Sequence, residues 1–104
     1  MDDLTTPGLE AARAAVGHDL HGRWPELLDA AAQARTWWVQ QWPDGAAYLP
    51  GLLAQDVQEA VHAGADPLWP ACRDHALFVE PDLGEDAFWV CHRTGLPVAE
   101  VGRL

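Results

Sequence analysis

Apolar residues return at the spacing of amphipathic helices over the first two thirds of the chain. Thr6 and Pro7 form a helix-start signal, in which a hydroxyl N-cap precedes proline at the first helical position. The apolar residues that follow fall on one face: Leu9, Ala12 and Val16. The first helix is therefore expected to end near Gly17, and residues 18–23 could be a loop or a further turn.

A longer helix is predicted from Pro25 to about Trp42, where Pro43-Asp44-Gly45 supplies a stop and a turn. Its expected buried stripe is Leu27, Leu28, Ala31, Ala34, Trp38, Val39 and Trp42. Trp37 lies about 100° of helical rotation from Trp38 and falls on the polar face. It is the large aromatic of this helix that the pattern does not bury.

A third helix is predicted from about Leu52 to Ala63, after a separating Pro50-Gly51 and before Gly64. Its inward residues are expected to be Leu53, Val57, Ala60 and Val61. The second and third helices should pack side by side because the connection between them is short.

After Pro67 the helical period gives way to short β-favouring runs separated by turn residues. Strands are expected at 76–80, 87–91 and 96–101, joined by a hairpin loop at 81–86 and a turn at 92–95. In the middle strand, Phe88 and Val90 should face one way and Trp89 the other. We therefore predict one α+β domain over 1–104, with three helices in 1–66 and a small three-stranded antiparallel meander in 67–104.

The charge balance excludes some partners. Among 104 residues, sixteen carboxylates oppose six basic side chains, all arginine, giving a net charge of −10. This charge repels nucleic acids and anionic membranes, and it attracts a basic protein or simply keeps the chain soluble. The N-terminal residues do not read as a secretion signal, which favours the cytoplasm, and the lysine-free composition is typical of a GC-rich bacterial genome.

The candidate metal ligands lie in the predicted meander. Cys72 and His75 form a C-x₂-H pair, and Cys91-His92 follow across the expected hairpin. Residues 69–101 thus resemble a zinc ribbon, in which two such knuckles hold one structural zinc, although Thr94 stands where the fourth ligand is expected.

The fourth zinc ligand is left open by the sequence. It could be His92, Asp74, His62 or a water molecule. The alternatives are a ribbon that has lost its metal and keeps both cysteines as small buried groups, a disulfide, or a reactive thiol. Three protein ligands would also suit a catalytic zinc, but no general base or nucleophile motif accompanies them, so an enzyme is not favoured.

Six tryptophans are many for so short a chain. Trp38, Trp42 and Trp69 are expected to fill a small core. Trp37 and Trp89 are the better candidates for a partner-covered surface, because aromatic residues on a polar face are enriched at interfaces.

These patterns leave three hypotheses for function. The first is a non-enzymatic protein-binding or adaptor protein whose unknown partner is basic. The second is a zinc-binding protein or metal-dependent enzyme that uses Cys72, His75 and Cys91. The third is an inhibitor or immunity-type protein that masks a basic partner. A homodimer through the third strand or Trp37 is a further alternative.

Overall fold

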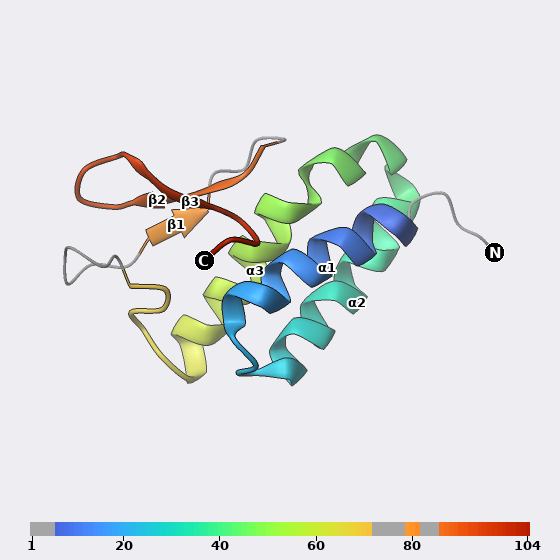
Figure 1. Cartoon of the computed structure of the whole chain (residues 1–104). Helices are drawn as coiled ribbons and strands as arrows, with labels where there is room; N and C mark the ends of the chain where they lie inside the picture. Colours follow the sequence, from blue (N-terminus) through green and yellow to red (C-terminus); the bar gives the residue numbers. More distant parts are fainter. Residues whose placement is uncertain (1–5, 72–78, 82–85) are drawn as a thin grey trace.

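Three helices precede a small antiparallel sheet (Figure 1). The structure is a computed structural model, and it describes residues 6–71, 79–81 and 86–104. The helices are α1 (Thr6–Leu20), α2 (Pro25–Gln41) and α3 (Leu49–Gly64), with a 3₁₀ helix, η1 (Pro43–Tyr48), between the last two. The strands are β1 (Val79–Pro81), β2 (Phe88–Cys91) and β3 (Pro97–Glu100), in the order β1-β2-β3. The predicted α+β arrangement is confirmed.

Two helices are longer than the sequence pattern indicated. α1 continues to Leu20 because Leu20 extends the buried stripe of Leu9 and Val16. α3 begins at Leu49, so Pro50 lies in its first turn, where a missing backbone N–H costs nothing. The expected separator Pro50-Gly51 is therefore part of the helix. None of the helices in the described ranges is long and apolar enough to cross a bilayer.

The core lies where the three helices meet one another and the sheet. The predicted inner faces of α1 and α3 are confirmed, except that Ala60 is only partly buried. On α2, Leu28 and Val39 are buried as expected, whereas Ala34 is exposed and Ala32 is buried in its place. The buried stripe of α2 is therefore rotated toward α1, which leaves its other flank open to solvent.

The middle strand of the sheet alternates between two environments. Trp89 and Cys91 are buried, and Phe88 and Val90 are partly buried, as the period of two predicted. Both neighbours pair antiparallel with β2, and the β2–β3 register shifts between Trp89 and Val90. The buried face of β2 meets the helical core, in which the Trp69 and Trp89 rings make an edge contact at 5.5 Å.

A buried carboxylate joins the helices to the sheet and to the last residues of the chain. The side chain of Asp19, near the end of α1, is fully buried. Its Oδ2 accepts hydrogen bonds from Trp89 Nε1 and Gly102 N, both at 2.7 Å, and its Oδ1 accepts one from Leu104 N at 2.8 Å. His18 Nδ1 lies 3.1 Å from the same Oδ1. One side chain thus fixes where β2 and residues 102–104 dock on α1.

Candidate functional site

A groove runs between α2 and α3 on the flank of α2 that the core leaves open. Its volume is about 540 Å³, and it is lined from both helices. Its lining includes small side chains from both helices: Ala30 and Ala34 of α2 and Ala60 of α3. Trp37 and Leu27 line it as well, so the groove is mostly apolar.

The two charges inside the groove compensate each other. Arg35 donates from Nε to Asp56 Oδ2 at 2.6 Å and from Nη2 to Asp56 Oδ1 at 3.0 Å. The guanidinium carbon also lies 4.8 Å from the ring centroid of Trp38, a cation–π distance. Because the pair is bidentate and partly buried, Arg35 is held in one orientation and offers little charge to a ligand.

Trp37 is the most exposed tryptophan among the residues that the structure describes, with 66% of its surface open to solvent. Its exposure was predicted from its place on the polar face of the helix, and that prediction is confirmed. Ala30 and Ala34, two turns and one turn earlier on α2, leave room beside its ring. Trp37 therefore combines a large apolar surface with an adjoining hollow.

A second aromatic group caps the end of α2. Trp42 is 48% exposed, so the prediction that it fills the core is wrong. The helix ends at Gln41, and Trp42 has φ −139° and ψ 80°, so its side chain leaves the direction of the helical stripe. Its ring meets Trp38 edge-on at 5.3 Å and stacks on Tyr48 at 6.2 Å. Trp38 is partly buried, whereas Trp69 is buried as expected.

The other proposed interface residue, Trp89, is fully buried within its own chain. The strand pattern correctly separated it from Phe88 and Val90, but the core lies on the opposite side from the one we expected. Its indole N–H is satisfied by Asp19, 70 positions away in sequence. The local sequence does not reveal that pairing. Cys91, which lies two positions after Trp89 on the same face of β2, is also buried.

The predicted metal ligands are only partly described. Cys72, His75 and Asp74 lie outside the described residues. Cys91 is buried and His92 is exposed, and His62 Nε2 lies 2.6 Å from the carbonyl oxygen of Trp69. Within residues 6–71, 79–81 and 86–104, no group of three or more metal-ligating side chains comes together. The zinc site stays a prediction.

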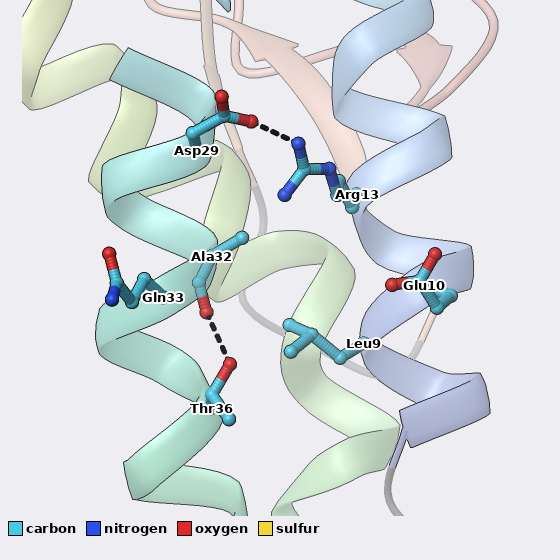
Figure 2. A pocket seen from close by; sticks show the side chains of 7 residues that line it. All are labelled: Leu9, Glu10, Arg13, Asp29, Ala32, Gln33 and Thr36. Carbon is cyan, nitrogen blue, oxygen red and sulfur yellow. Dashed lines mark hydrogen bonds and ion pairs between the residues drawn. The ribbon is translucent and has the colours of Figure 1, made fainter. Parts of the chain in front are cut away.

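The opposite flank of α2 forms a smaller and more polar pocket with α1, of about 350 Å³ (Figure 2). Arg13 of α1 and Asp29 of α2 reach across it and form an exposed ion pair, while Thr36 Oγ1 bonds back to the carbonyl of Ala32. Leu9, which also lines the pocket, is buried, so the pocket offers a partner little apolar surface compared with the groove beside Trp37.

Comparison with known proteins identifies a family. No curated protein and no solved structure matches the chain. Residues 5–101, nearly the whole sequence, match the model of a family described as "Domain of unknown function (DUF8819)". The chain therefore belongs to this family.

Proposed function

We propose that this chain is a non-enzymatic protein-binding domain and that its contact surface is the groove between α2 and α3. The observation that supports this proposal is the exposure of Trp37 beside an apolar hollow. Tryptophan is among the residues that contribute most to binding energy at protein interfaces, because its ring buries a large area with few rotatable bonds.

The expected contribution of Trp37 is large enough to measure. Burying about 100 Å² of apolar indole surface is worth about 2.5 kcal/mol at 25 cal/mol per Å². Truncation of a central interface tryptophan costs about 2 kcal/mol or more. These estimates correspond to affinity losses of about 30-fold to 60-fold, so a loss of at least about 10-fold is expected.

Charge supports a basic partner. Arg13, Arg35 and Arg103 each face a carboxylate of the same chain, so their positive charge is already compensated locally. The net charge of −10 is therefore carried by carboxylates with few cations left to oppose them. A basic surface would be drawn toward such a protein, and raising the salt concentration would weaken the attraction.

The test compares two exposed tryptophans. We immobilise the wild-type chain and the variants Trp37→Ala and Trp42→Ala, and use each to capture partner proteins from a lysate of the cells that naturally produce the chain. Proteins retained by the wild type are identified, purified and titrated against each variant by calorimetry. We expect Trp37→Ala to weaken binding at least about 10-fold and Trp42→Ala, which lies outside the groove lining, by less than about 3-fold. Equal affinities for the wild type and Trp37→Ala would refute the proposal.

A further inference from the structure

We infer that the groove receives an amphipathic α-helix of about three turns, presented by a basic partner protein, an inference that rests on the proposed function. It identifies the kind of segment that the groove fits. The inference draws on three properties of the described residues: the shape of the groove, its length and the arrangement of charge in and beside it.

The shape of the groove suits a helix. It lies between two helices, and ridges of side chains on a third helix can pack into such a furrow. Ala30, Ala34 and Ala60 project only a methyl group each, so a partner backbone can come close. Helices separated by small residues approach to about 8 Å, near the lower end of the usual range. Trp37 then covers one side of the incoming helix.

The length of the groove sets the length of the segment. Along α2 the lining residues extend from Leu27 to Trp38. At 1.5 Å per residue this stretch is about 16 Å long. A helix lying along it needs about 11 residues, or three turns, to match. Its apolar contacts would then recur at positions i, i+3 or i+4, and i+7.

The charges favour a basic helix over an acidic one. Arg35 is engaged by Asp56 and Trp38, so an acidic segment would find no available cation among the described lining residues. Glu26 and Glu59 are exposed and directly precede the lining residues Leu27 and Ala60 in sequence. Successive residues of a helix point about 100° apart, so these carboxylates lie on the outer sides of α2 and α3, where arginine or lysine on the flanks of the incoming helix could pair with them.

The same charge argues against a second copy of this chain as the occupant. Two copies would bring together two molecules that each carry a net charge of −10. The repulsion between them would be strongest at low ionic strength, where attraction to a basic helix is also strongest. Raising the salt concentration should therefore weaken the binding of a basic helix but strengthen the association of two copies.

The test uses synthetic helical peptides as probes. Two labelled peptides of about 15 residues share the apolar spacing i, i+3, i+7 and carry either arginine or glutamate at the flanking positions. A third peptide has the arginine composition with the apolar positions scrambled. Fluorescence anisotropy measures their binding to the wild-type chain, Trp37→Ala, Glu59→Lys and the control Trp42→Ala.

We expect the basic peptide to bind at least about 10-fold more tightly than the acidic or scrambled one. Trp37→Ala should lower its affinity about 10-fold and Glu59→Lys about 3-fold, with Trp42→Ala unchanged. Equal binding of the basic and acidic peptides, binding that is insensitive to Trp37→Ala, or no binding of the basic peptide would overturn the inference.

The outcomes also separate this inference from the proposed function. If the captured partner requires Trp37 but the basic peptide does not bind the groove, the inference fails and the proposed function stands. If the captured partner ignores Trp37, the proposed function fails. Sedimentation of the wild-type chain should show a monomer at low salt, and a dimer that Trp37→Ala dissociates would assign the groove to a second copy.

Discussion

Replacing Asp19 should destabilise the fold more than replacing any exposed carboxylate. The side chain is fully buried, and three N–H groups donate to it, from Trp89, Gly102 and Leu104. Asp19→Ala removes both carboxylate oxygens and leaves the three N–H groups without this hydrogen-bond acceptor. Each buried N–H group that loses its hydrogen-bond acceptor lowers the free energy of unfolding by about 1–3 kcal/mol. The hydrogen bonds from Gly102 and Leu104 are only part-buried, so water can replace the lost acceptor there and reduce the cost. We therefore expect Asp19→Ala to lower the free energy of unfolding by about 3–5 kcal/mol in total.

Asp19→Asn gives a sharper test because it removes only one of the two oxygens. An amide oxygen in the place of Oδ2 still accepts from Trp89 and Gly102, whereas the amide nitrogen then faces the N–H of Leu104. One bond is lost instead of three, so the expected cost is about 1–3 kcal/mol. The order of stability should therefore be wild type, then asparagine, then alanine.

Urea unfolding followed by tryptophan fluorescence measures these differences. For a loss of 3 kcal/mol and a slope of about 1–3 kcal/mol/M, the midpoint of Asp19→Ala should fall by at least about 1 M. Asp29→Ala is the matched control, since it removes a carboxylate from an exposed ion pair and should cost less than about 1 kcal/mol. An Asp19→Ala variant that unfolds at the wild-type midpoint would refute the assignment of Asp19 as the link between α1, β2 and residues 102–104.

Three further predictions follow from other parts of the chain. Gly45→Ala would place a Cβ 2.5 Å from Trp38 Cη2 and 2.7 Å from Trp42 Cε3, so thermal unfolding should show a loss of stability of about 1–3 kcal/mol. The control Gly64→Ala, whose Cβ meets nothing within 4 Å, should be neutral or slightly stabilising, and equal melting temperatures of the two variants would contradict this prediction. Arg35→Lys removes the bidentate hydrogen bonds to Asp56 and the contact with Trp38, so chemical denaturation should show a fall of about 1 kcal/mol in the free energy of unfolding. An unchanged midpoint would mean that the pair does not order the groove. The zinc site predicts about one zinc per chain in elemental analysis of untagged protein and a lower melting temperature after chelation, and metal-free protein whose melting chelators leave unchanged would exclude it.

Helix periodicity predicted most of the helical half. The stripes of α1 and α3 were correct apart from the partly buried Ala60, because the buried residues of each helix fall on one face that a period of 3.6 identifies. The prediction was less accurate for α2, where Ala34 is exposed and Ala32 is buried. Two stripes of α2 have helical spacing, one through Leu28, Ala32 and Val39 and one through Leu27, Ala31 and Ala34, so periodicity alone did not decide which of them faces the core.

The candidate site was predicted only in part. Trp37 was identified because a tryptophan among glutamines and alanines breaks the polar face of a helix. Trp89 was assigned to the wrong side because a short strand shows alternation without showing which face meets the core. The Arg35–Asp56 pair was not anticipated, since its members are 21 positions apart and lie on different helices. Their spacing carries no local signal, and only the packing of α2 on α3 brings them together.

The central claim, that a partner binds in the groove beside Trp37, is tested most directly by mapping the contact on the protein itself. Amide and indole resonances of the ¹⁵N-labelled chain are followed by NMR as the purified captured partner is added. The account predicts that the largest shifts occur at Ala30, Ala34, Trp37 and Ala60, with little change at Trp42 and in the α1–α2 pocket. Saturable shifts elsewhere, with the resonances of the groove unchanged, would contradict it.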